Sequence, residues 1–291
     1  MRPTSTNDEN KKYPSNINEN YTKENDNLNK HLSLVRKRII VFLILSVFLI
    51  NYLVISSEGD TKKFYENITN VVTSSLGVII GTLMLTRISK NLILSNIKNK
   101  ALLSFTIGLF LWLLAHSLWA YNVVGLGIDA PFPSPSDAIW ILGYIFFGYY
   151  FFVMNRLFRR QGEEDILIHI SLTTAIALGY IYILTFGVAE LVSAQHDVLA
   201  TILSILYPML DGALLIPSIS ILCNTKNKDP SSLLWILLSL SMISFIGGDI
   251  YFGYGSMLGI ENLGVTAIFY NVGYLAISFG LFWHYKLSKP Y

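Results

Sequence analysis

Long apolar segments alternate with short polar connections along most of this chain. Each segment is about 20 residues long, the length that a helix needs to cross a bilayer core about 30 Å thick. Lipid offers backbone groups no hydrogen-bond partner, so we expect the segments to be helical. The predicted spans are 39–56, 67–86, 101–122, 137–155, 166–189, 197–222, 231–254 and 263–285. The pattern therefore predicts an all-α polytopic membrane helical bundle with eight transmembrane helices, occupying residues 37–287.

Positive charge falls almost entirely on one side of this predicted bundle. Of the 21 Lys and Arg residues, all but Lys62 and Lys63 lie in the N-terminal segment, in alternate connections or after the last span. Basic residues near the ends of spans stay in the cytoplasm. We therefore predict a multi-pass protein of the cell membrane, with the lipid bilayer as a partner and both termini cytoplasmic.

The segment before the first span has a different composition. Residues 1–30 are rich in Asn, Asp, Glu, Lys and Ser and contain very few aliphatic side chains. Such a segment cannot bury enough apolar surface to offset its ordering entropy. We predict that residues 1–36 form a disordered cytoplasmic tail, and that the first apolar run is an uncleaved anchor rather than a signal peptide.

The overall composition narrows the classes of function. Apolar residues make up 53% of the chain and charged residues 14%, whereas soluble domains carry about 25% charged residues. The net charge of +2 is small, so no nucleic-acid partner is expected. Cys223 is the only cysteine, which excludes an intramolecular disulfide and a cysteine metal site. The sequence predicts no metal site and no catalytic residue, and it leaves any cofactor unknown.

A weak internal repeat relates the third and fourth spans to the seventh and eighth. Residues 115–119 and 140–144 correspond to residues 247–251 and 270–274, about 130 positions later along the chain. Four spans separate the copies, so both point the same way through the membrane. This spacing predicts two parallel four-helix repeats related by an axis along the membrane normal.

Polar side chains inside the spans are the best indication of function, because an Asp at the bilayer centre costs about 2.5–3.5 kcal/mol on insertion scales. Asp211 lies near the middle of the sixth span, and Asp249 and His116 lie nearer the outer ends of the seventh and third. These residues could form a proton-responsive or ligand-binding polar core. Alternatively, they could hydrogen-bond across helices and fix the packing.

Helical spacing places polar and aromatic residues on shared faces of four spans. If these faces converge, they form an aromatic-walled cavity that contains acids, opens outward and suits an apolar or cationic ligand. The alternative is ordinary enrichment of Trp and Tyr at the membrane interface. The predicted ligand-binding residues are His116, Trp119, Asp137, Trp140, Tyr144, Tyr207, Asp211, Asp249, Tyr251, Asn271 and Tyr274.

Two local features bear on these residues. The run Ser134-Pro135-Ser136-Asp137 predicts a helix start with a capping Ser, Pro at the first helical position and an acid at the third. Asp137 therefore has a structural explanation as well as a functional one. Pro208 lies one turn before Asp211 and predicts a weakened or kinked helix there.

Three short motifs carry a resemblance to a known family. Pro135-Ser136-Asp137, Tyr207-Pro208-Met209-Leu210-Asp211 and Asp249-Ile250-Tyr251 resemble motifs of the multi-span membrane sensor region found upstream of bacterial GGDEF-type diguanylate cyclases. The resemblance covers about residues 39–285 and implies membrane sensing of an unknown ligand. The chain departs from the family around His116 and Ser117, where an acid is often expected, and we expect no cytoplasmic output domain in it. We therefore expect signalling through a separate cytoplasmic partner.

Two alternatives remain beside a non-enzymatic sensor. The Gly-Asp helix around Asp249 is also similar to lysoplasmalogenase-like intramembrane hydrolases, which use paired acids, although the third span offers no second acid. A small-solute transporter would have broken helices and a site at the membrane midplane. Asp211 beside Pro208 is the only indication of such a site. The sequence identifies neither the ligand nor the oligomeric state.

Overall fold

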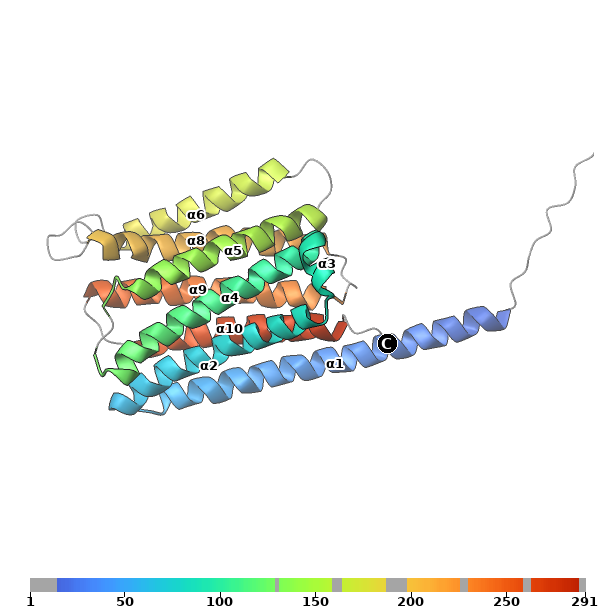
Figure 1. Ribbon diagram of the computed structural model, residues 1–291, viewed down its shortest axis with the longest axis horizontal. Helices are drawn as coiled ribbons and strands as arrows, with labels where there is room; N and C mark the ends of the chain where they lie inside the picture. The colour runs from blue at the N-terminus through green and yellow to red at the C-terminus, as the bar shows by residue number, and fades with distance from the viewer. Residues whose placement is uncertain are drawn as a thin grey trace, which may run out of the picture. The chain divides into compact units, whose positions relative to one another are not determined.

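The computed structural model describes the backbone of residues 15–128, 131–158, 164–186, 198–225, 230–258 and 263–287, and in these residues it contains helices and no strand. The helices are α1 (Ser15–Ile55), α2 (Gly59–Thr86), α3 (Lys90–Ser95), α4 (Ile97–Ala120), α5 (Pro135–Phe158), α6 (Glu164–Phe186), α8 (Val198–Asn224), α9 (Ser232–Leu258) and α10 (Leu263–Leu287). A π-helical turn, η1 (Tyr121–Gly125), extends α4. The all-α prediction is confirmed (Figure 1).

Eight of the described helices are long and apolar enough to cross a membrane, which confirms the predicted polytopic bundle. The apolar windows belong to every helix above except the short α3. The second helix begins at Gly59, eight residues before its predicted start at 67, because its first two turns are polar. The fifth predicted span, 166–189, runs beyond the described end of α6 at Phe186.

The chain divides after Val41 into two units. The first unit contributes the N-terminal turns of α1 from Ser15. Residues 1–14 lie outside the described part, and the disorder expected for residues 1–36 stays a prediction. The second unit, from Phe42 onward, holds all the other helices and the last turns of α1.

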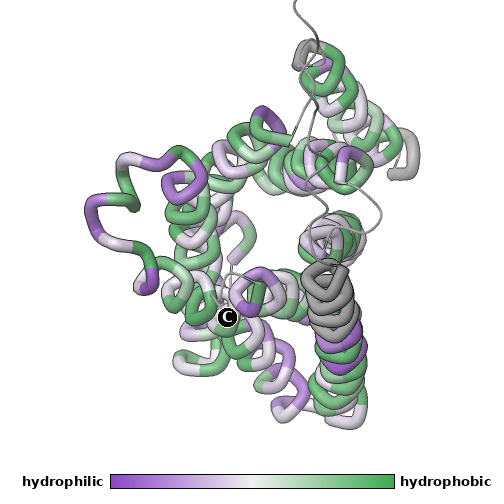
Figure 2. The backbone as a smooth tube through the Cα atoms, turned by 90° about the vertical axis from the view of Figure 1, so that its right-hand side faces the viewer, coloured by the Kyte–Doolittle hydropathy of each residue, from purple (hydrophilic) through white to green (hydrophobic). Residues whose placement is uncertain are grey.

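Six helices of the second unit form a closed ring. Each neighbour packs on the next in the order α2, α4, α5, α8, α9, α10 and back to α2, and α6 lies outside the ring against α8. The contact of α2 with α4 matches that of α8 with α9, and the contact of α4 with α5 matches that of α9 with α10. This pattern supports the predicted pair of parallel repeats. Figure 2 views the helices nearly end-on.

Apolar side chains on the outside of the bundle meet lipid, while the interior holds aromatic and polar groups. Phe48 and Ile145 are examples of exposed apolar residues, and Phe105, Phe147 and Phe151 are buried inside. Glycines let the helices of each pair approach closely, as is common in membrane proteins. Gly143 of α5 packs on Trp112 of α4, as Gly273 of α10 packs on Phe245 of α9.

The predicted helix start at Ser134 is confirmed, and α5 begins at Pro135. The Ser136 amide donates to Ser134 Oγ at 3.2 Å, and the Ser134 amide donates to Asp137 Oδ2 at 2.6 Å. These reciprocal bonds form a capping box, which fixes where α5 enters the membrane. One oxygen of Asp137 is therefore committed to the cap.

The contact between Gly143 and Trp112 makes a testable prediction about stability. A Cβ atom at Gly143 would clash with the Trp112 ring, which donates to Trp140 O at 3.0 Å. We expect Gly143→Ala to lower the free energy of unfolding by about 1–3 kcal/mol, because overpacking forces side chains off their rotamers. Gly148→Ala, on the same helix with nothing within 4 Å, should be neutral or up to about 1 kcal/mol more stable. Denaturant unfolding in detergent would check this, and equal stability of both variants would contradict it.

Candidate functional site

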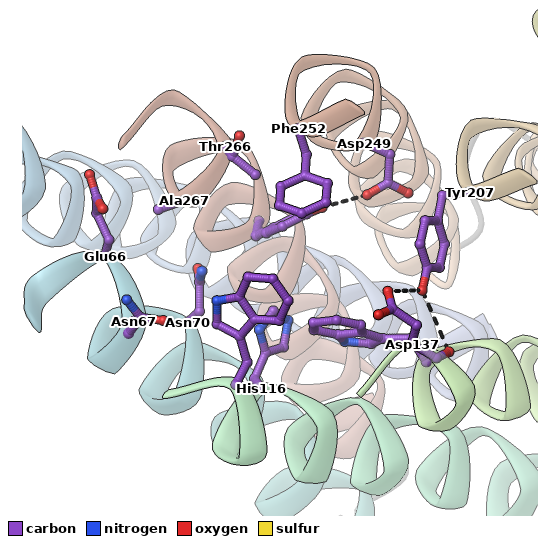
Figure 3. Close-up of a pocket in the computed structure, with 13 residues that line it drawn as sticks. Glu66, Asn67, Asn70, His116, Asp137, Tyr207, Asp249, Phe252, Thr266 and Ala267 are labelled. Atoms are coloured by element: carbon purple, nitrogen blue, oxygen red, sulfur yellow. Dashed lines mark hydrogen bonds between the residues drawn. The ribbon is translucent and has the colours of Figure 1, made fainter. Parts of the chain in front are cut away.

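A cavity opens at one end of the ring, where α2, α5 and α10 begin and α4 and α9 end. It encloses about 600 Å³ of space not filled by atoms, part of which is open to solvent (Figure 3). It is lined by Glu66, Asn67, Asn70, His116, Trp119, Asp137, Trp140, Tyr207, Asp249, Phe252, Thr266, Ala267 and Tyr270. A smaller cavity of about 280 Å³ adjoins it and shares Trp140, Tyr207, Asp249 and Tyr270. The deeper residues of this second cavity are Trp112, Tyr144, Phe245 and Tyr274.

Asp137 connects the start of α5 to α8. Its Oδ2 serves the capping box, and its Oδ1 accepts a hydrogen bond of 2.7 Å from the Tyr207 hydroxyl. Asp137 is 3% exposed, so both oxygens act in a largely dry environment, where hydrogen bonds to a charged group are strong. The structural role of Asp137 in the capping box and its predicted role in ligand binding are therefore compatible.

Asp211 and Asp249 lie close to each other. The Tyr144 hydroxyl donates to Asp211 Oδ1 at 2.8 Å, and the Tyr270 hydroxyl donates to Asp249 Oδ1 at 2.5 Å. Tyr144 bonds to Asp211 and also lines the smaller cavity with Asp249, so the two carboxyl groups share one part of the bundle. Asp249 lines both cavities, whereas Asp211 is fully buried behind them. Together with the bond from Tyr207 to Asp137, these bonds join α5 to α8 in both directions and α9 to α10.

His116 occupies the centre of the aromatic wall. Its Nε2 lies 2.8 Å from the Tyr274 hydroxyl, and its ring centroid is 5.2 Å from those of Trp140 and Tyr274. Tyr270 packs edge-on against it at 5.8 Å. One nitrogen of His116 is thus engaged with α10, and the ring itself forms part of the cavity surface.

Three large rings form the entrance side of the wall. Trp119 lies 5.8 Å from Trp140 and 5.9 Å from Phe252, measured between ring centroids. Phe252 also packs edge-on against Phe132 of the connection before α5, at 5.0 Å. The proline-containing connection therefore contributes to the mouth of the cavity.

The first turns of α2 supply a polar side of the cavity that the sequence analysis did not predict. Glu66, Asn67 and Asn70 are buried and line it, together with Thr266 of α10. Asn70 Oδ1 and Thr266 Oγ1 have no hydrogen-bond partner. The signal was present in the sequence, because polar residues and then glycines recur at helical spacing along one face of the second span, but the predicted span began one residue too late to include Glu66.

The predicted site residues mostly converge. His116, Trp119, Asp137, Trp140, Tyr207 and Asp249 line the larger cavity, while Tyr144 and Tyr274 line the smaller one. Asp211, Tyr251 and Asn271 belong to neither set of lining residues. Ligand binding by any of them stays a prediction. Tyr270, which lines both cavities, was missed although it lies one turn before the predicted Tyr274.

Asn271 instead holds three helices together. Its Nδ2 donates to Asn51 Oδ1 at 3.1 Å and to Thr69 Oγ1 at 3.0 Å, and its Oδ1 accepts from the Thr73 hydroxyl at 3.1 Å. The side chain is fully buried. This network joins α10 to α2 and to the last turns of α1, so Asn271 has the packing role that the sequence left open for Asp211, Asp249 and His116.

Within the described parts of the chain, no group of three or more His, Cys, Asp or Glu side chains could hold a metal ion. The chain matches no protein-family model, no curated protein and no solved structure. The site must therefore be interpreted from its own geometry, and the resemblance to sensor regions stays a prediction.

The role assigned to Asn271 can be tested directly. Asn271→Ala removes three interhelical hydrogen bonds, each worth roughly 0.6 kcal/mol on average inside a membrane. We expect a loss of about 2 kcal/mol in the free energy of unfolding in detergent. Asn91→Ala, at an exposed position of α3, should change stability by less than about 0.5 kcal/mol. Unchanged stability of Asn271→Ala would refute the packing role.

Proposed function

We propose that this protein is a membrane-embedded sensor that binds a small organic cation in an outward-facing cavity and passes its occupancy to a separate cytoplasmic partner. The observation that carries the proposal is the lining of the larger cavity. Glu66, Asp137 and Asp249 combine there with aromatic side chains, and the described lining contains neither Lys nor Arg.

The chemistry of this lining favours a cation over a neutral ligand. A buried carboxylate without a compensating charge is costly, and an incoming ammonium group supplies that charge. Aromatic faces also attract cations, by about 0.5–2 kcal/mol each depending on desolvation. Trp119, Trp140 and Phe252 provide such faces beside Asp249, so the pocket can pair with the cation and also replace part of its hydration shell.

The distribution of basic residues supports the outward orientation. Arg87, Arg156 and Lys286 lie at or next to the C-terminal ends of α2, α5 and α10, whereas these helices begin at the cavity. Since basic residues mark the cytoplasmic side, the cavity opens on the opposite side of the membrane. A ligand would reach it without crossing the bilayer.

The hydrogen bonds of the acids suggest how occupancy changes the bundle. An ammonium group beside Asp249 competes with Tyr270, and one beside Asp137 competes with Tyr207. Tyr207 directly precedes Pro208, which leaves α8 one helical hydrogen bond short although the helix continues through it. A ligand shifts such an equilibrium only by its differential affinity for the two arrangements. The geometry therefore favours α8 as the element that responds.

The proposal predicts a charge-selective binding profile for the purified full chain. Titration calorimetry in detergent should show binding of butylammonium, but not of butanol or butyrate, because only the cation pairs with the acids. Asp249→Asn should weaken butylammonium binding by about tenfold or more, as expected for the loss of a charge-assisted contact. The matched Asp60→Asn variant, changed at an exposed position of α2, should bind normally. Equal binding of butanol and butylammonium would contradict the proposal.

The proximity of Asp211 and Asp249 favours a second candidate, an intramembrane hydrolase acting on lipids. Two neighbouring carboxyl groups can divide the general acid and base roles that hydrolysis requires. The test is turnover of lysoplasmalogen by the purified protein. Turnover that is lost in Asp211→Asn and retained in Asp60→Asn would support the hydrolase, while absence of turnover in the unaltered protein would exclude this substrate class.

A further inference from the structure

The larger cavity has hydrogen-bond acceptors at both ends. Figure 3 shows Glu66 at one side of the cavity and Asp137 and Asp249 at the other, with His116 and Phe252 between them. The acceptors at the two ends come from different helices, since Glu66 belongs to α2 while the two aspartates belong to α5 and α9. A single ammonium group occupies only one of these ends.

The end formed by α2 is built to receive a donor. Asn70 Oδ1 and Thr266 Oγ1 are buried without a hydrogen-bond partner, and their residues are 9% and 4% exposed. Both line the cavity together with the Glu66 carboxylate. Unmet buried acceptors are costly, so this end gains from a ligand group that carries several N–H donors.

The space between the two ends is walled by rings rather than by further polar groups. Trp119, Trp140, Phe252 and the His116 ring form this wall, in mutual edge or tilted contacts. Such a surface favours methylene groups over water. The cavity therefore combines two polar ends with an apolar middle.

We propose that the ligand of this cavity is a linear α,ω-diamine, with one ammonium group at Asp249 and Asp137, the other at Glu66 and Asn70, and its methylene chain along the aromatic wall. The inference rests on the proposed binding of an organic cation and names its chemical class. An ammonium group offers three donors and no acceptor, which suits the acceptor-rich set at each end.

Lys62 lies beside Glu66 and competes with a ligand for it. A Cβ atom at Gly264 would lie 3.0 Å from both Glu66 Oε1 and Lys62 Cε, so the glycine leaves room for these side chains side by side. The charges of Lys62 and Glu66 attract each other. A diamine must displace or share this partner, so removal of the Lys62 charge should strengthen diamine binding and leave monoamine binding unchanged.

The first test compares matched amines by titration calorimetry on the full chain in detergent. Putrescine and cadaverine should bind about tenfold or more tightly than butylamine and pentylamine, because a second charge-assisted contact forms only with the diamines. Glu66→Gln, which keeps the side-chain shape, should abolish this preference by lowering diamine affinity to that of the monoamines. An unchanged midpoint of thermal unfolding in detergent shows that the variant is folded. Asn70→Ala should weaken the preference in the same direction by a smaller factor.

The opposite effect on diamine affinity is expected for Lys62→Gln. This variant should raise diamine affinity severalfold and leave butylamine affinity unchanged. Equal affinity of diamines and monoamines would overturn the inference while leaving cation binding intact. A diamine preference that survives Glu66→Gln would overturn it as well, since the second ammonium would then lie elsewhere. If no amine binds at all, the proposed function itself fails and the inference fails with it.

Discussion

The absence of water inside a bilayer determines where this chain can place its polar groups. A side chain that needs a hydrogen bond finds no partner in lipid, so the polar residues of the spans must find each other. The ring of six helices provides that interior. Its outer surface is apolar, and several of its buried polar residues bond across helices or line the cavity. The same constraint that stabilises the bundle thus concentrates acids, amides and phenols at one place.

The two seams between the halves of the ring are closed by different chemistry. Where α5 meets α8, Tyr144 donates to Asp211 and Tyr207 donates to Asp137, so the helices exchange tyrosine–aspartate bonds in both directions. Where α10 meets α2, the amide of Asn271 bonds to threonine hydroxyls. A carboxylate responds to an added cation, whereas an amide does not change its charge. The tyrosine–aspartate bonds of the first seam are therefore suited to respond to a ligand, whereas the bonds of Asn271 at the second seam are not.

The sequence predicted the fold well because the membrane signal is long and cooperative. Eight apolar windows and their flanking charges specify the number of helices and their alternation, and the capping box at Ser134 is local enough to read directly. It was harder to predict which side chains of different helices meet inside the bundle. Asn271 directly follows Tyr270 but points into a different network, because a rotation of one residue by about 100° changes the neighbouring helix.

Glu66 and Asn70 were not predicted for a different reason. Glu66 and Asn70 lie in polar turns before the apolar part of the second span, so a hydropathy criterion assigned the first of them to a connection. In the structure α2 already begins at Gly59 and carries these side chains into the bundle. A criterion that follows the polar residues on one helix face, rather than the average hydropathy of a window, would have identified Glu66 and Asn70. The distances between the acids depend on the packing of several helices and could not be read from a single chain segment.

The predicted repeat has a consequence for the symmetry of the site. A ring made of two similar halves offers two similar positions for a site, and the position in α4 that corresponds to Asp249 in α9 is Ser117 by the alignment of the two aromatic motifs. Ser117 donates its hydroxyl to Leu113 O of its own helix at 2.8 Å, so it needs nothing from a ligand. The acid is kept in one half and replaced in the other. Approximate twofold repetition of the helix contacts thus coexists with an asymmetric set of acids at the cavity.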